Sequence, residues 1–160
     1  MRKLSHVDEK GAVQMVDVGS KDVTKRTAIA QAIVQAKSET LDLIFSDKLP
    51  KGDVVATAKL AGIMAAKKTS DLIPLCHPLP ISSANIDIKR EGAEHIALSA
   101  TVQVTGKTGV EMEALTAVTV AALTLYDMAK AVDKGICIQE VKLLMKEGGK
   151  SGRYEVAATC

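Results

Sequence analysis

The sequence predicts an α+β fold, an antiparallel sheet with helices packed on one face. Residues 84–89 and 96–104 alternate apolar with polar side chains on either side of a short connection, REGAE, which is typical of an antiparallel hairpin with one face in water. Helical spacing of apolar residues in 53–68 and 110–132 indicates two longer helices. The order strand, helix, helix, strand, strand, helix, strand lacks the regular alternation of a parallel α/β sheet, which favours α+β.

The first predicted strand and the short helix after it lie in residues 27–45. Ile and Gln alternate from Ile29 to Gln35, which favours a strand over 27–36, although the alanines between them would also suit a helix. Ser38 is a suitable N-cap for a short helix over 39–45, whose early acidic residues complement the helix dipole.

The turn sequence LPKG separates this helix from the next one, for which Asp53 is a suitable N-cap. Two cations, Lys67 and Lys68, are expected at its C-terminal end. Three prolines in 71–80 then exclude regular helix from that passage.

The longest predicted helix runs from about Val110 to Val132 and is stopped by Gly135. A last strand over Ile136–Lys146 leads into a glycine-rich tail. With these elements, the chain is expected to form a single domain over residues 1–160, loosely ordered at 1–14 and 153–160.

The composition restricts the class of partner. The 160 residues are 47% hydrophobic and 25% charged, which is ordinary for a globular domain that buries a sizeable core. With no Trp, one Phe and two Tyr, the core must consist of aliphatic side chains, and the aromatic platforms that bind single-stranded nucleic acid are missing. A formal net charge of +2 adds no broad basic field, so we expect no nucleic-acid partner.

The cysteines and the apolar segments bear on the compartment. Cys76, Cys137 and Cys160 are widely spaced and odd in number, which suits free thiols in a reducing compartment. The N-terminal residues include no apolar run of the kind found in signal peptides. The most apolar segment, 114–126, is shorter than the ~20 residues of a membrane-spanning helix. We therefore expect a soluble, cytoplasmic protein without a membrane partner.

Two short glycine-lysine segments, TGKTG at 105–109 and GGKSG at 148–152, resemble the end of a phosphate-binding P-loop. A P-loop requires a further glycine five residues earlier, where this chain has Thr101 and Leu144, so neither segment is one. A glycine loop entering a helix, with its free amides and Lys107, could still hold an anion, and a plain tight turn is the alternative.

One helical pair is suited to acid–base chemistry. Lys130 lies three residues after Asp127 and can contact it on the same helix face. Glu113, fourteen residues before Asp127, falls within ~40° of it around the axis. The neighbours of the pair are apolar, and in an apolar setting the two pKa values would be set by burial and by each other. The alternative is an ordinary surface ion pair.

The remaining candidates are a Cys–His step and several cations. Adjacent residues such as Cys76 and His77 rarely close a metal site, so zinc is improbable, and we expect no metal ligands. His77 is a candidate for proton transfer or substrate binding, with a hydrogen-bonded loop histidine as the alternative. The cations Arg26, Lys51, Lys67 and Lys146 would form a polyphosphate site if several converge.

Four stretches together are similar to the MoaC family, the cyclic pyranopterin monophosphate synthases of molybdenum cofactor biosynthesis. They are SETL, KGDVVATAKLAGIMAAKKTSDLIPLCHPL, TGKTGVEMEALTAVTVAALTLYDMAKAVDKG and LLMKEGGKSG. The resemblance implies a ferredoxin-like protomer and a homo-hexamer, a trimer of dimers, with active sites at subunit interfaces. It also implies a lyase reaction in which 3′,8-cyclo-7,8-dihydro-GTP rearranges to cyclic pyranopterin monophosphate and releases diphosphate.

The resemblance also implies roles for individual residues. The matched catalytic positions are Asp127, Lys130, Lys51 and His77. The matched substrate-binding positions are Leu75, Cys76, His77, Met112, Glu113 and Lys146. Two of the cations named above, Lys67 and Arg26, are further candidates for substrate binding. No cofactor is implied, although Mg²⁺ could accompany the triphosphate. A ligand-sensing α+β module that binds a nucleotide without consuming it is the competing interpretation, and it requires no paired Asp127 and Lys130.

Overall fold

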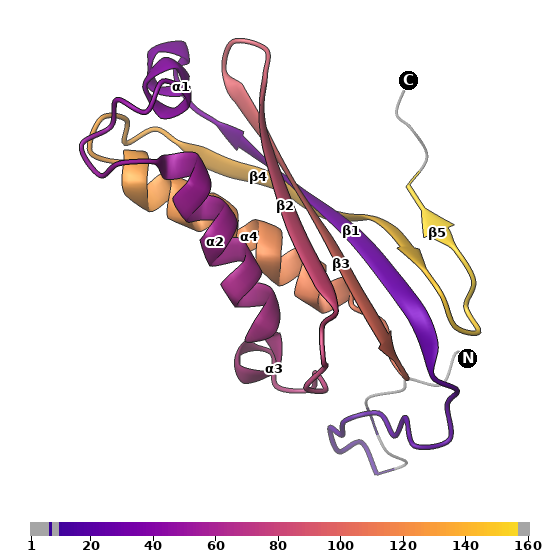
Figure 1. The fold of residues 1–160 in the computed structure, drawn as a ribbon. Coiled ribbons are helices and arrows are strands. Elements are labelled where there is room, and N and C mark those ends of the chain that lie inside the picture. Colours follow the sequence, from indigo (N-terminus) through magenta and orange to yellow (C-terminus); the bar gives the residue numbers. More distant parts are fainter. Residues whose placement is uncertain (1–6, 8–9, 157–160) are drawn as a thin grey trace.

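The computed structural model of the chain describes residue 7 and residues 10–156. In this part of the chain, a five-stranded sheet has the order β2-β3-β1-β4-β5, with all neighbouring strands antiparallel (Figure 1). The strands are β1 (Thr24–Gln35), β2 (Ser83–Glu91), β3 (His95–Gly106), β4 (Cys137–Glu147) and β5 (Tyr154–Glu155). The helices are α1 (Ser38–Phe45), α2 (Val54–Lys67), α3 (Thr69–Leu72) and α4 (Glu111–Ala129).

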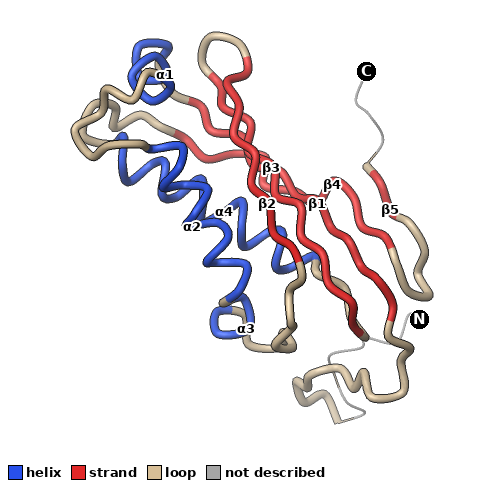
Figure 2. The backbone as a smooth tube through the Cα atoms, in the orientation of Figure 1, coloured by secondary structure: helices blue, strands red, loops and turns tan. Residues whose placement is uncertain are grey.

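The helices α2 and α4 lie on the same face of the sheet, as the blue helices beside the red strands show in Figure 2. α4 packs across β1, β3 and β4, whereas α2 packs against α4 and β2. Along the chain, β1, α2, β2, β3, α4 and β4 follow the strand-helix-strand-strand-helix-strand order of a ferredoxin-like fold. The predicted α+β class, with helices on one face, is confirmed.

The core lies between this helical layer and the sheet. On β1, the alternate residues Ala28, Ala30, Ala32 and Val34 are fully buried, because every second side chain points to the same face. The period of two in this segment therefore marks a strand, and its alanines are the small side chains beneath α4, which contacts β1.

The helices α2 and α4 approach each other closely at a glycine. A Cβ on Gly62 would lie 2.9 Å from the carbonyl oxygen of Ala117 and 3.2 Å from the Cβ of Ala121.

At the start of α2, the Asp53 carboxylate accepts a hydrogen bond from the backbone N–H of Ala56, which confirms the predicted N-cap.

The start of α1 differs from the prediction. Ser38 is the first helical residue, Lys37 is the N-cap, and no side chain of the helix caps it. The buried Asp133 from the loop after α4 accepts hydrogen bonds from the Lys37 N–H (3.0 Å) and from the Thr40 hydroxyl (3.2 Å). The cap is supplied from 96 residues away, so local sequence could not predict it.

The other differences lie at the ends of elements. α4 ends at Ala129 instead of Val132, because the chain turns there and brings the Asp133 carboxylate to α1. The last long strand ends at Glu147 rather than Lys146. A one-turn helix, α3, precedes Pro74, and the short strand β5 pairs with the end of β4; neither was predicted.

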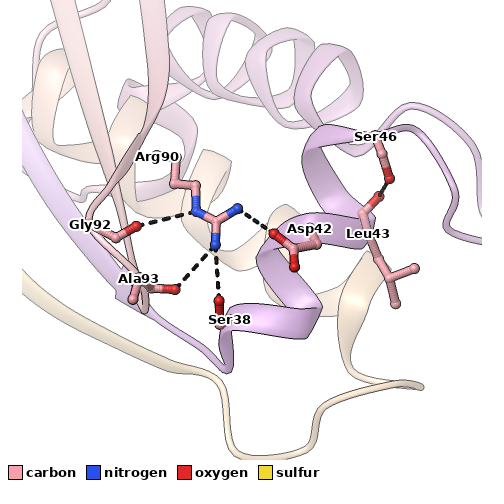
Figure 3. A network of polar contacts seen from close by, with 7 residues as sticks. All are labelled: Ser38, Asp42, Leu43, Ser46, Arg90, Gly92 and Ala93. Carbon is pink, nitrogen blue, oxygen red and sulfur yellow. Dashed lines mark hydrogen bonds and ion pairs between the residues drawn. The ribbon is translucent and has the colours of Figure 1, made fainter.

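The tip of the β2–β3 hairpin is attached to α1 through Arg90 (Figure 3). The guanidinium forms an ion pair with Asp42, donates to the Ser38 hydroxyl at 3.1 Å, and donates to the carbonyl oxygens of Gly92 and Ala93. These contacts connect α1 to the sheet at one side, while Asp133 holds it at the other.

Within the described residues, α4 is the one helix whose length and composition would allow it to cross a membrane. Half of that apolar segment is buried inside the protein, against the sheet and α2. The apolar character of α4 is therefore accounted for by the core of the fold.

Candidate active site

A cavity of about 390 Å³ lies at the N-terminal end of α4. The proline-rich passage after α3 forms one wall with Leu75, Cys76 and His77, and the first turn of α4 forms another with Met112 and Glu113. The predicted substrate-binding residues of these two segments therefore line the same cavity. The segment before β1 completes it with Val16, Val18 and Lys21, and the loop before α4 adds Thr108, Gly109 and Glu111.

Burial raises the pKa of two groups in this cavity. Glu113 is only 4% exposed, and desolvation raises the pKa of its carboxyl, with the nearby charge of Glu111 adding to the effect. Burial also raises the pKa of the Cys76 thiol, and the Glu113 charge acts in the same direction. A raised pKa disfavours the thiolate of Cys76, which argues against a nucleophilic Cys–His pair.

A groove leads away from this cavity, and its charged lining residues are the bases Lys21, Arg26 and Lys146 and the acids Glu111 and Glu147; we call it the basic groove. Thr108, Gly109 and Glu111 line both, and the groove continues to Arg26 and Lys146. The Lys146 ammonium pairs with the Glu111 carboxylate at 2.8 Å. Two of the four predicted cations, Arg26 and Lys146, therefore converge here.

Both glycine-lysine segments line the groove, although they lie some forty residues apart in the sequence. Thr108 and Gly109 come from the first segment, and Gly148 and Ser151 come from the second. The Lys107 ammonium instead donates a hydrogen bond to the carbonyl oxygen of Gly19, in the segment before β1, at 2.6 Å. The first segment thus lines the groove through its last two residues.

The second segment requires its glycines. Gly148 and Gly149 have φ values of 102° and 73°, a region that side chains disfavour. A Cβ on Gly149 would collide with the Arg26 guanidinium, and one on Gly148 would collide with the carbonyl oxygen of Lys25. The glycines therefore allow the loop to lie directly over Arg26.

The second group of predicted residues lies at the opposite end of α4. The Asp127 carboxylate is 2.6 Å from the Lys130 ammonium and 3.1 Å from that of Lys51, and Lys51 also donates to the Asp127 carbonyl oxygen. The hydrogen bond from Lys130, supported by Lys51, lowers the pKa of Asp127, and Asp127 in turn raises the pKa of Lys130. We call Lys51, Asp127 and Lys130 the triad.

The prediction that Asp127 and Lys130 lie in an apolar environment is wrong for the isolated chain. The side chains of Asp127 and Lys130 are 55% and 51% exposed, so pairing and not burial sets their pKa values. The stripe of exposed residues on α4 runs through Met112, Thr119, Leu123, Asp127 and Lys130. Glu113, fourteen residues earlier in the same helix, lines the cavity and is only 4% exposed, so the two acids differ in burial although both belong to α4.

The cavity and the triad are far apart. Fourteen residues of helix separate Glu113 from Asp127, which corresponds to about 21 Å along the axis. The helix α2 runs antiparallel to α4. Lys51, just before the start of α2, contacts Asp127 near the end of α4, whereas Gly62, further along α2, lies against Ala117, which is earlier in α4. Lys67, at the other end of α2, is therefore on the cavity side, although it does not line the cavity.

Sequence reasoning missed Glu111 and Lys21. Glu111 connects cavity and groove through its pair with Lys146, and Lys21 lines both spaces from the segment before β1. A first-turn acid after a glycine loop was the available indication for Glu111, whereas nothing local distinguishes Lys21. Across residue 7 and residues 10–156, no three His, Cys, Asp or Glu side chains are grouped to hold a metal ion.

The fold and the site define an α+β protein that presents a half-apolar cavity beside a basic groove, as needed for a small anionic ligand. The MoaC family profile matches residues 15–149. The chain belongs to the MoaC family.

Its relatives share most of the chain. A cyclic pyranopterin monophosphate synthase of Parvibaculum lavamentivorans is 57% identical over 155 residues, 96% of this chain and 97% of that protein. Proteins of the same name from Novosphingobium aromaticivorans and Herpetosiphon aurantiacus are 55% and 56% identical, and cover 98% and 95% of this chain and 99% and 93% of their own lengths.

Proposed function

We propose that this chain is a cyclic pyranopterin monophosphate synthase of molybdenum cofactor biosynthesis, a phosphorus–oxygen lyase. Its substrate is 3′,8-cyclo-7,8-dihydro-GTP, supplied by a radical enzyme, and its products are cyclic pyranopterin monophosphate and diphosphate. The observation that carries this proposal is the convergence of the cavity residues with Arg26 and Lys146 in a continuous groove, in a chain whose relatives bear that name. Such a groove suits a nucleoside at one end and its phosphates at the other.

The triad supplies the acid–base chemistry in this proposal. The Lys130 ammonium, held protonated by Asp127, is a proton donor, and Asp127 fixes its direction. Lys51 and His77 assist as the purine ring opens and the pterin ring closes. Lys146 neutralises charge on the phosphates as the cyclic phosphate forms and diphosphate leaves.

Because the triad is about 21 Å from the cavity along α4, one chain alone does not bring both to one substrate. Leu60, Met64 and Leu123 are 58%, 52% and 55% exposed on the helices between the two ends, and form an apolar surface suited to a second copy. A two-fold axis through this surface would set the triad of each chain at the cavity of the other. We therefore propose composite sites in a dimer, three of which form a cytoplasmic homo-hexamer.

The activity is tested by incubating the protein with the cyclised dihydro-GTP, with and without Mg²⁺, and measuring diphosphate and pterin fluorescence. Consumption of the substrate is expected for the native chain, and its loss for Asp127→Asn. Binding without consumption would instead favour a nucleotide sensor. A folded Asp127→Asn protein with the native rate would refute the catalytic role of the triad.

The composite site has a sharper test. Asp127→Asn and His77→Ala are each expected to be inactive, but in a mixed dimer one site carries both substitutions and the other carries neither. With random pairing, about half of the dimers are mixed, so about a quarter of the native activity should return. No recovery on mixing, with exchange of subunits verified by mass spectrometry, would contradict sites shared between chains.

A further inference from the structure

The segment before β1, residues 15–23, forms part of the cavity wall without belonging to the sheet. The β1–β3 ladder stops at the pair Thr24 and Gly106, and this segment lies beyond it, in the indigo loop that leads into β1 in Figure 1. Its side chains alternate in burial: Val16 and Val18 are half-buried and line the cavity, whereas the residues on either side of each valine are exposed. The segment therefore covers one side of the cavity with its valines, and we call residues 15–23 the strap.

Few contacts hold the strap in place. None of its residues is fully buried, so packing contributes little to its local stability. Its internal hydrogen bonds form a single turn, in which the Gly19 N–H donates to the Asp17 carboxylate at 2.7 Å and the Lys21 N–H donates to the Val18 carbonyl oxygen at 3.1 Å. Across the described residues, one hydrogen bond joins the strap to another part of the chain, the bond from the Lys107 ammonium to the Gly19 carbonyl oxygen.

Lys107 is well placed to hold the strap. Its backbone is fixed, because the preceding Gly106 is the last ladder residue of β3 and because the Lys107 carbonyl oxygen accepts a hydrogen bond from the Arg26 guanidinium at 3.3 Å. Its side chain is half-buried and forms no ion pair with a carboxylate in the part of the chain that the structure describes. The next residue, Thr108, lines the cavity. Lys107 therefore joins the strap to the loop that forms another part of the same wall.

We propose that Lys107 is a positioning residue that closes the strap over the bound nucleoside; this rests on the proposed function. The segment TGKTG then uses its lysine to hold a wall of the cavity, not to bind the ligand. While the bond to Gly19 is intact, Val16 and Val18 cover one side of the ligand and exclude water from it. Without this bond the strap moves away, and the ligand binds more weakly while the triad is unchanged.

Hydrogen–deuterium exchange of the ligand-free protein tests the attachment of the strap without requiring turnover. Lys107→Met keeps the length of the side chain but removes the donor, so the amides of residues 15–23 should exchange about tenfold faster than in the native chain. Lys107→Arg keeps a charged donor and should leave the exchange close to native. Lys142→Met, which removes a lysine from an ion pair with Glu140 on β4, is the matched control and should not affect the strap.

Turnover of the cyclised dihydro-GTP tests the consequence for the reaction. Lys107→Met should raise KM by about tenfold and leave kcat within about twofold of the native value, because the substrate loses a wall of its cavity but not the triad. Lys107→Arg should restore most of the loss. Asp17→Ala removes the acceptor of the turn that presents the Gly19 carbonyl oxygen, and it should change exchange and KM in the same direction but less.

Three results would overturn the proposal. A raised KM for Lys107→Met with native exchange in the ligand-free strap would mean that Lys107 contacts the ligand directly. A fall in kcat at native KM would place Lys107 in the chemistry, and equal losses for Lys107→Arg and Lys107→Met would show that no donor to the strap is needed. The two proposals fail separately. Faster exchange in Lys107→Met, with no consumption of the cyclised nucleotide by the native chain, would refute the enzyme activity but support the attachment of the strap. Native exchange and native KM in Lys107→Met would refute the role of Lys107 alone.

Discussion

Replacing the buried Asp133 by Asn should destabilise the protein while leaving its shape almost unchanged. Asp133 is 3% exposed, and its two oxygens accept from the N–H groups of Lys37 and Gly135 and from the Thr40 hydroxyl. These bonds connect the start of α1 to the loop after α4. Asn offers one oxygen and one amino group, so at least one of the two backbone N–H groups would face another donor.

The size of the effect follows from that mismatch. Leaving one buried donor unsatisfied costs about 1–3 kcal/mol of unfolding free energy. For a chain of this size, a loss of about 2 kcal/mol corresponds to a fall in Tm of roughly 4–8 °C. Asp42→Asn is the matched control, because the Asp42 side chain is 64% exposed in its pair with Arg90 and should contribute less than about 1 kcal/mol.

The pH dependence gives a second measurement. The hydrogen bonds, first of all that from the Lys37 N–H, lower the pKa of Asp133 below its value in the unfolded chain. Its contribution to stability is therefore complete above the unfolded pKa of about 3.9 and is lost as the pH falls through the lower pKa of the folded state. Thermal denaturation at equal protein concentration should show a large difference between the native chain and Asp133→Asn at pH 7, shrinking below about pH 4. Equal losses for Asp133→Asn and Asp42→Asn, or a difference that does not change with pH, would refute this reasoning.

Two further substitutions separate packing from chemistry. Gly62→Ala should lower the unfolding free energy by about 1–3 kcal/mol in urea denaturation, although Ala is the better helix former. The added Cβ would lie 2.9 Å from the Ala117 carbonyl oxygen and would push α2 away from α4. An unchanged urea midpoint would mean that the two helices move apart at no cost in stability. Lys130→Arg should keep the ion pair with Asp127 but reduce diphosphate release by about 100-fold or more, because a guanidinium does not give up its proton. A near-native rate for Lys130→Arg would show that this position supplies charge alone.

Much of the fold could be predicted from periodicity. The alternation in β1, β2 and β3 and the helical spacing in α2 and α4 reflect burial on one face, which each segment records in its own residues. The start of α1 could not be predicted in this way, since its cap comes from Asp133. The strand β5 is too short to show any period.

The candidate site was predicted in its residues but not in its arrangement. The spacing of Asp127 and Lys130 indicates their contact, because residues three apart on a helix are neighbours on its surface. The joining of Lys51 to that pair depends on the antiparallel course of α2 and α4. Only the structure shows that Glu113 is buried in the cavity wall while Asp127 is exposed, since an angular estimate says nothing about which neighbour covers a side chain.

By itself, the sequence determined the α+β class, the helix that carries Asp127 and Lys130, and the failure of both glycine-lysine segments as P-loops. Only the tertiary structure decided that these two segments meet at one basic groove, and that the cavity and the triad lie at opposite ends of α4. The physical reason is that helical and strand periods are fixed by contacts between near neighbours in the chain. The meeting of distant loops is fixed by how the helices and the sheet pack, and no local pattern of residues encodes it.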